Sequence, residues 1–549
     1  MANCASSVIA TSLHYIRRVQ SVNSLRLGFY PQQAAILMSN LSLMKTLRIK
    51  DWAFLSLSIL FISLFSHPLT AQNLEEFEQK VTEFTLDNGL HVIVIERDVA
   101  PVASFLTYVN VGGVDEPVGN TGIAHIFEHM AFKGTHDIGT TDWEAEEVAI
   151  NATEAAYQAW LSAKNEGASE QDLESLWTAF TEAQEQAKTY VVNNEFSQII
   201  EQSGGTGLNA FTSSDETAYF YSLPQNKAEL WFNLESARFR NPVFREFYVE
   251  KDVVKEERRM RTDSSPLGRL IEMFLYEAYD IHPYRNPVVG WAEDITATTI
   301  TDAKAFYETY YVPSNMTIAI AGDVDPDEMR RLAETYFGGF DAGDPVPEPG
   351  KVEPKQTEEV RFTMEDPSQP VWLAGYHTVS NSHPDFAALS LLGDIISVGR
   401  TSRLYKKLVE ETQMALAVQA LNGFPGTRYP SLFVTFAVPN RGVDVMDIEA
   451  MIDDEIALVQ SGDITQEELD RVLTNRRASI VRSLNSNSGL ALQAATAHAQ
   501  QGTWKEIFTQ LDDLEAVTLD DLQRVANTYL VKENRTVGMI QNTSTADAQ

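Results

Sequence analysis

The sequence is poor in cysteine, histidine and basic residues. Among its 549 residues there are one cysteine and ten histidines, and 42 Lys and Arg stand against 77 Asp and Glu, a formal net charge of −35. A single cysteine cannot form a disulfide within the chain, so the fold must rest on its hydrophobic cores. An acidic surface disfavours nonspecific binding to nucleic acid or anionic membranes, and we expect neither partner.

Long apolar runs are also lacking. The run from Trp52 to Phe65 is too short for a membrane span. Basic residues precede it and Leu-Thr-Ala71 follows it, an order typical of a secretory signal peptide. We interpret residues 44–71 as this signal and residues 1–43 as the product of an upstream start codon. An uncleaved anchor is the alternative. The prediction is an exported protein, in the periplasm of a Gram-negative-type bacterium or secreted, with no stable membrane span after signal cleavage.

Strand and helix signals alternate along the rest of the chain, which predicts an α+β fold. Residues 84–98 predict two short strands around an Asn-Gly turn, and residues 102–111 predict a further strand. Residues 142–192 are rich in Ala, Glu, Gln, Leu and Lys and predict a protruding helical hairpin whose second helix is capped by Ser169. We interpret this hairpin as a surface insertion without chemistry.

The chain also shows an internal repeat. Four prolines interrupt residues 341–358, which predicts a linker between an N-terminal domain, residues 72–340, and a C-terminal domain, residues 359–549. Residues 309–318 are similar in sequence to residues 528–537, at a constant offset of 219. Several matches in one register indicate a duplicated domain, so we expect two homologous, sandwich-like domains, each with an antiparallel-rich sheet and helices.

The clearest chemical signal is His125-Ile-Phe-Glu128-His129. Residues four apart lie on one face of a helix, so both histidines face the same way, with Glu128 beside them. Two neutral imidazoles suit Zn²⁺, a nearby carboxylate can take a proton from an attacking water, and the order is that of an inverted zinc-peptidase motif. Thr121 predicts the N-cap of this helix and Gly134 its end. The alternative is a pair of buried histidines that only satisfy core hydrogen bonds.

Spacing alone leaves the third ligand open, because acidic residues are numerous. Residues 246–260 predict a helix in which Glu250 and Glu257, seven apart, share one face. A solvated acidic face is the alternative interpretation. A closed structural zinc site would need a further Cys or His, which the motif itself does not contain. We assign the remaining histidines, His282 among them, to packing or loops.

The motif and the residues after it, His125 to Thr135, resemble the zinc-site helix of the pitrilysin/insulinase family, which includes mitochondrial processing peptidase. The resemblance extends from about Val81 to the C-terminus. Other matching stretches are residues 204–212, 241–244, 311–316 and 399–405. This resemblance, to the shorter, processing-peptidase-like members, implies two halves that enclose a chamber and a zinc metalloendopeptidase that holds one Zn²⁺ per chain.

The resemblance also implies roles for matching residues. Glu257 becomes the third ligand beside His125 and His129, Glu128 the general base, and Glu250 an acid that orients a ligating histidine. The 142–192 insertion accounts for the long gap before Glu257. Four residues match an edge strand that pairs with the peptide substrate in relatives: Asn209, Ala210, Phe211 and Thr212. An ordinary sheet edge is the alternative.

One departure concerns the second half, where many relatives carry an Arg and a Tyr seven residues apart that contact the substrate. Val409 and Leu416 stand at these places, and neither can hydrogen-bond a substrate carbonyl. We therefore hypothesise a metal-free homologous subunit as partner, with a homodimer as the alternative. The competing functions are a non-catalytic scaffold of the same fold and a binding module with structural zinc. The complete motif argues against the scaffold.

Overall fold

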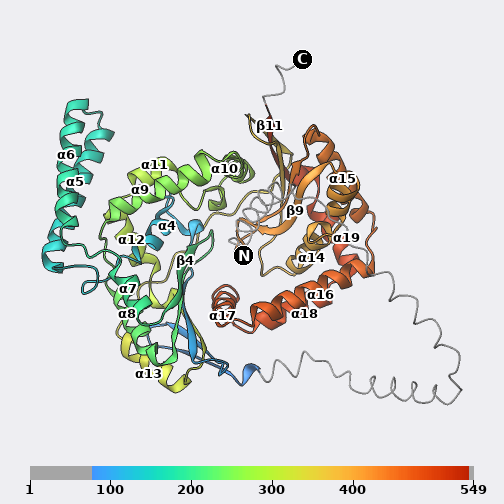
Figure 1. Cartoon of the computed structure of the whole chain (residues 1–549). Coiled ribbons are helices and arrows are strands. Elements are labelled where there is room, and N and C mark those ends of the chain that lie inside the picture. The colour runs from blue at the N-terminus through green and yellow to red at the C-terminus, as the bar shows by residue number, and fades with distance from the viewer. Residues whose placement is uncertain (1–76, 543–549) are drawn as a thin grey trace, which may run out of the picture. The chain divides into compact units, whose positions relative to one another are not determined.

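The computed structural model describes residues 77–542, so the predicted signal segment and the residues before it lie outside the described part (Figure 1). The described residues from Thr82 onward form one compact unit. No helix in the described range is long and apolar enough to cross a membrane. The unit contains two β-sheets with helices packed on them, which confirms the α+β prediction.

The first sheet has six strands in the order β1-β2-β6-β3-β5-β4. Their bounds are β1 Val81–Thr85, β2 His91–Glu96, β3 Val102–Val109, β4 Thr206–Thr212, β5 Thr217–Pro224 and β6 Met316–Gly322. Every residue of β6 is buried, because this strand lies in the middle of the sheet and under helices. The helices of this half are α4 Ile123–Met130, α5 Trp143–Asn165, α6 Glu170–Lys188, α7 Glu195–Gln202, α8 Ala228–Arg240, α9 Phe247–Arg258, α10 Pro266–Ala278, α11 Ala292–Ala297, α12 Ile300–Tyr310 and α13 Pro326–Phe337.

The second sheet has five strands in the order β7-β11-β8-β10-β9. Their bounds are β7 Val360–Asp366, β8 Val371–His377, β9 Ala415–Phe424, β10 Leu432–Pro439 and β11 Arg535–Asn542. The helices of this half are α14 Asp385–Ser397, α15 Val445–Gln460, α16 Gln466–Ser483, α17 Asn487–Gln501, α18 Glu506–Ala516 and α19 Leu519–Tyr529. A hydrophobic core separate from that of the first half lies between this sheet and its helices.

The two halves repeat one topology, as the constant sequence offset predicts. α12 and α19 each begin with a capping box, formed by Thr299 and Asp302 in one half and by Thr518 and Asp521 in the other. β6 then pairs in parallel with β2 and antiparallel with β3, and β11 does the same with β7 and β8. The sheets differ in one strand, β1, which is added at the edge of the first. Duplication of the fold is confirmed.

Residues 142–192 contain the two expected helices, α5 and α6, which project beyond the other helices of this half in Figure 1. The side chain of Ser169 accepts a hydrogen bond from the N–H of Asp172 and caps α6, as predicted. Aromatic rings hold the hairpin together and against α9, namely those of Tyr157, Trp160, Trp177, Phe180 and Tyr248. The predicted linker, residues 341–358, contains no helix or strand.

Polar side chains join the two halves at the loop after β9. The guanidinium of Arg428 lies 3.1 Å from the carboxylate of Asp115, whose side chain is fully buried. Asp215 accepts hydrogen bonds from the N–H of Thr427 at 2.6 Å and of Arg428 at 3.1 Å. Such buried carboxylates are stable only when they are paired in this way.

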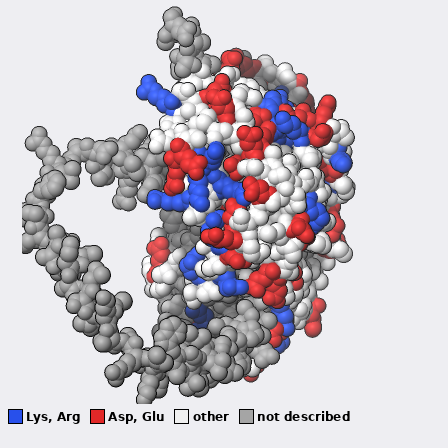
Figure 2. Space-filling view, turned by 90° about the vertical axis from the view of Figure 1, so that its right-hand side faces the viewer, with Lys and Arg blue, Asp and Glu red and all other residues white. Residues whose placement is uncertain are grey.

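Helix α17 belongs to the second half in sequence but packs against β3 and β6 of the first sheet. At one end Asn487 donates to the carbonyl oxygen of Val102 at 3.3 Å, and at the other Gln500 donates to the carboxylate of Glu216 at 3.2 Å. Figure 2 shows the side of the molecule that lies to the right in Figure 1, and there acidic and basic side chains of the described residues are interspersed.

Candidate metal centre

Helix α4 carries the His-x-x-Glu-His motif and is held by its apolar face. Ile123, Ile126, Phe127 and Met130 are each at most 3% exposed, so burial of this face fixes the rotation of the helix. The opposite face then presents His125, Glu128 and His129 together.

The caps of α4 differ from the prediction. Thr121 is not the N-cap, because its hydroxyl donates instead to Asp294 at 2.7 Å. The buried carboxylate of Glu116 accepts hydrogen bonds from the N–H groups of Gly122 and Ala124 at 2.8 and 3.0 Å. A residue earlier in the chain thus pairs N–H groups at the helix start that have no partner within the helix. The helix ends at Met130, before Gly134.

Helix α9 brings Glu257 to the histidine pair. Its Oε2 lies 3.6 Å from Nε2 of His125 and 3.8 Å from Nε2 of His129. The imidazole rings stand nearly perpendicular, at 88°, with centroids 4.9 Å apart. One ligand atom from each residue falls within 4.8 Å of the others. The three residues predicted as ligands therefore converge, although 128 positions separate His129 from Glu257.

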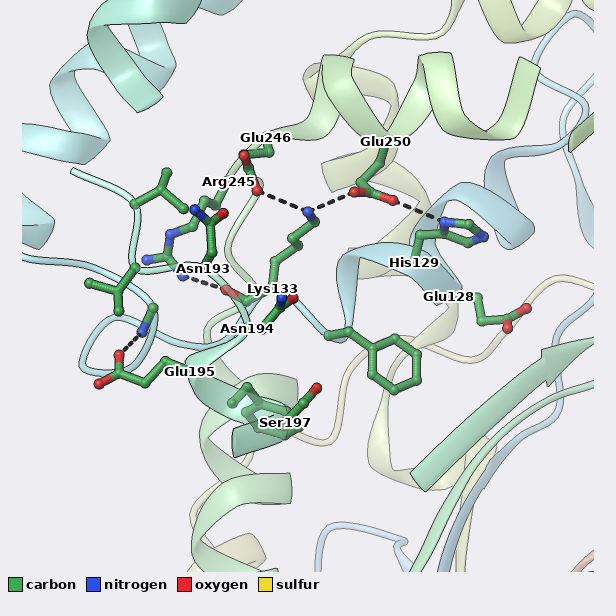
Figure 3. Close-up of a pocket in the computed structure, with 15 residues that line it drawn as sticks. Glu128, His129, Lys133, Asn193, Asn194, Glu195, Ser197, Arg245, Glu246 and Glu250 are labelled. Carbon is green, nitrogen blue, oxygen red and sulfur yellow. Dashed lines mark hydrogen bonds and ion pairs between the residues drawn. The ribbon is translucent and has the colours of Figure 1, made fainter. Parts of the chain in front are cut away.

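Glu250 lies on one side of this cluster and is the first member of a chain of charges (Figure 3). Its Oε2 is 3.0 Å from Nδ1 of His129, which leaves Nε2 of that ring directed to the cluster. Its other oxygen is 2.6 Å from the ammonium of Lys133, which also contacts Glu246 at 2.9 Å. The sequence-based prediction missed Lys133, which lies three residues beyond the end of α4.

Glu128 is linked to the edge strand. The hydroxyl of Thr212, at the end of β4, donates to Oε2 of Glu128 at 2.6 Å. β4 lies at the edge of the first sheet and pairs only with β5 among the described strands. Asn209 is exposed on it, Phe211 and Thr212 are half-buried, and Ala210 is buried. The four residues predicted to bind substrate thus form a free strand edge beside the cluster.

The pKa values of the cluster follow from burial and charge. Burial, with the nearby His129 and Arg261, lowers the pKa of His125 to about 3, so this imidazole is neutral. Burial raises the pKa of Glu128, and the Thr212 hydrogen bond only partly opposes it. Burial alone would raise the pKa of Glu250, but its hydrogen bonds to His129 and Lys133 outweigh burial and lower this pKa. Glu250 is therefore held as a carboxylate.

A cavity of about 290 Å³ lies beside Glu128 and His129 (Figure 3). Lys133, Glu246 and Glu250 line one part of it, and residues 191–197, which follow α6, line another. The insertion at 142–192 therefore contributes its last two residues, Val191 and Val192, to the wall of this cavity, although we predicted a surface insertion without chemistry.

These features define a two-half α+β protein with a His-His-Glu cluster of the inverted type. The family model described as Insulinase (Peptidase family M16) matches residues 92–162 and 183–291, and the model described as Peptidase M16 inactive domain matches residues 297–476. The chain belongs to this pitrilysin/insulinase family. The break in the first match falls in the helical hairpin, and all three cluster residues lie within the matched segments.

Named relatives agree with this assignment. The chain is 29% identical over 484 residues to a Helicobacter pylori protein named Zinc protease PqqE, an alignment that covers 86% of this chain and 94% of the relative. It is 27% identical to an uncharacterized zinc protease of Mycobacterium leprae, covering 82% and 90%. Among solved structures, a protease from Helicobacter pylori superposes with a TM-score of 0.70 at 26% identity and covers 84% of this chain and 99% of that one.

Proposed function

We propose that this chain is an exported zinc metalloendopeptidase that hydrolyses peptides or unfolded protein segments. The observation that carries the proposal is the convergence of His125, His129 and Glu257 within 4.8 Å, with Glu128 on the same helix. Two relatives that are named zinc proteases, and that align with this chain over almost their whole length, also support it.

The three side chains fit Zn²⁺. Imidazole nitrogens and a carboxylate oxygen are ligands of catalytic zinc, and tetrahedral zinc with bonds of about 2.0–2.1 Å holds neighbouring donors roughly 3.3 Å apart. The separations of 3.6 and 3.8 Å from Glu257 to the two histidines are close to this value. The Glu250 contact to His129 is of the type that orients a ligating imidazole. When bound there, Zn²⁺ would acidify a water molecule and polarise the substrate carbonyl.

In this mechanism Glu128 acts as general base. Its carboxylate takes a proton from the attacking water and passes it to the leaving amine. The hydrogen bond from Thr212 holds one carboxylate oxygen, so the other remains available for the proton. The raised pKa of Glu128 favours this transfer, because a more basic carboxylate accepts a proton more readily.

For substrate binding, we infer that the extended peptide adds to the free edge of β4, along Asn209, Ala210, Phe211 and Thr212. Backbone hydrogen bonds to a sheet edge bind an extended peptide regardless of its sequence, while pockets for its side chains give sequence specificity. The Thr212 contact to Glu128 supports this path, since it brings the strand edge to the general base.

A partner subunit is part of the proposal. Val409 packs against the core of the second half, and Leu416 on β9 is 45% exposed. Neither carries a hydrogen-bond donor for a substrate, so a metal-free homologous subunit would supply these contacts; a homodimer is the alternative. Copurification from the native source, followed by mass measurement of the complex, distinguishes the two. A lone chain with full activity would exclude both.

The test of the activity is peptide turnover by wild type and Glu128→Gln, with zinc measured in both. We expect Glu128→Gln to keep zinc and to lose about 10²–10⁴ in kcat, the usual contribution of a general base. Glu256→Gln is the matched control, because Glu256 is exposed on α9 and, among the described residues, pairs with Arg259 alone. Equal activity in Glu128→Gln and wild type would overturn the mechanism, and a zinc-loaded wild type without turnover on any peptide would favour the scaffold.

Export is proposed from the signal-like residues 44–71. A solved structure of the periplasmic protease PqqL from Escherichia coli is similar to this chain at 16% identity, which supports only a shared fold. N-terminal sequencing of the protein isolated from its native cells tests export: a mature chain that starts near position 72 supports it, and an intact Met1 or Met44 argues against cleavage.

A further inference from the structure

A second cluster of metal-ligating side chains lies where the two halves meet. Glu83 comes from β1, His91 from β2 and His498 from α17, and one ligand atom of each lies within 4.8 Å of the others. The rings of His91 and His498 are parallel within 5° and their centroids are 3.6 Å apart. From the sequence, these two histidines were expected to serve packing or loops, because no regular spacing along the chain connects them with Glu83.

Nδ1 of His498 is buried and has no hydrogen-bond partner among the described residues, and Nε2 of His91 is buried and faces a carboxylate oxygen of Glu83. The other nitrogen of His91 contacts the hydroxyl of Thr85 at 3.0 Å, so Nε2 is the one left for a ligand. Oε2 of Glu83 is 3.3 Å from that atom. A buried polar atom without a partner is rare and costly, so Nδ1 of His498 needs an explanation.

We propose that Glu83, His91 and His498 bind a second divalent cation of the zinc type, which joins the two halves. Two imidazoles and one carboxylate are a zinc donor set, with a water completing four-coordination. A cation would give Nδ1 of His498 a partner and would lie between Nε2 of His91 and the carboxylate of Glu83. Tetrahedral zinc holds neighbouring donors roughly 3.3 Å apart, so donor atoms that lie within 4.8 Å of one another must approach by at most about 1.5 Å, and the stacked rings tilt toward the ion.

The protonation state of the histidines suits such an ion. Burial, and to a smaller extent the nearby His91, lowers the pKa of His498 to about 4. Burial also lowers the pKa of His91. Both imidazoles are therefore neutral at neutral pH, which is the form that coordinates metal.

Binding at this place would hold α17 on the first sheet. The helix already contacts β3 and β6 and donates from Asn487 to the carbonyl oxygen of Val102. A cation shared by β1, β2 and α17 would add a link that exists only while the helix is docked. The cluster shares no residue with His125, His129 and Glu257, so the inference does not depend on the proposed catalytic activity.

The test is zinc stoichiometry in the full chain, stripped of metal, titrated with Zn²⁺ alone and measured by elemental analysis. We expect two equivalents in wild type, one in His498→Gln, one in Glu257→Gln and none in the double variant. His383→Gln is the control, because His383 is 45% exposed and lies outside both clusters. Two equivalents in His498→Gln, or one in wild type that Glu257→Gln abolishes, would overturn the proposal.

A second variant separates metal binding from folding. Cysteine is also a zinc ligand, so His498→Cys should regain the equivalent that His498→Gln loses, whereas a packing role for the ring would not be rescued. In the Glu257→Gln background, Zn²⁺ should also slow amide exchange in α17, and His498→Gln should remove that effect. Failure of Cys to restore binding in a folded protein, or unchanged exchange, would count against the site.

Discussion

Replacing Glu250 with Gln tests how the charge chain beside the metal centre acts on His129. Glu250 is the only described carboxylate in contact with Nδ1 of His129, at 3.0 Å, and its side chain is 14% exposed. Gln keeps the size and can still accept a hydrogen bond, but it removes the negative charge. Loss of a carboxylate that orients a ligating histidine weakens metal binding by about 10–100-fold, or roughly 1.4–2.8 kcal/mol.

The same substitution also changes the metal-free protein. Lys133, 2.6 Å from Glu250, would keep only Glu246 at 2.9 Å. Losing one charged hydrogen bond in this partly buried position should lower the free energy of unfolding by about 1–2 kcal/mol. Zinc affinity and stability are thus expected to fall together, although through different contacts.

The assay is competition for Zn²⁺ with a chromophoric chelator, alongside urea unfolding of the metal-free protein. Glu256→Gln, on the same helix but exposed, should change neither quantity. Lys133→Met separates the two effects, because it removes the ion pair and keeps the carboxylate that faces His129. A zinc dissociation constant in Glu250→Gln within twofold of wild type would refute the assigned role, whatever the stability shows.

Four further predictions concern the edge strand, the buried ion pair between the two halves and the start of α4. Thr212→Val removes the 2.6 Å hydrogen bond to Glu128 and should lower kcat/KM for a peptide roughly tenfold, with zinc content unchanged; unchanged turnover would contradict this. Arg428→Met leaves Asp115 buried without its cation and should cost about 3–5 kcal/mol in urea unfolding, unless Asp115→Asn accompanies it. Burial raises the pKa of Asp115 from 3.8 to about 6, so its contribution to stability is present below about pH 4 and is lost as pH rises through 6; Asp115→Asn should flatten that part of the curve. Gly122→Ala places a Cβ 2.6 Å from a backbone oxygen at φ +87°, and we expect a lower thermal midpoint and weaker zinc binding.

The sequence alone determined the features that depend on local spacing. The four-residue interval places His125 and His129 on one helix face because an α-helix has 3.6 residues per turn. Ser169 predicts a helix start because its hydroxyl reaches a nearby N–H group. The offset of 219 predicts the repeated sheet topology because homologous segments fold alike.

Only the tertiary structure decided which distant residues meet. The start of α4 is capped by Glu116 rather than by Thr121, because Asp294 engages the Thr121 hydroxyl. Packing of α17 on the first sheet brings His498 against His91, from the opposite half of the chain. Such contacts depend on how whole helices and sheets bury their apolar faces, and no interval along the chain encodes them.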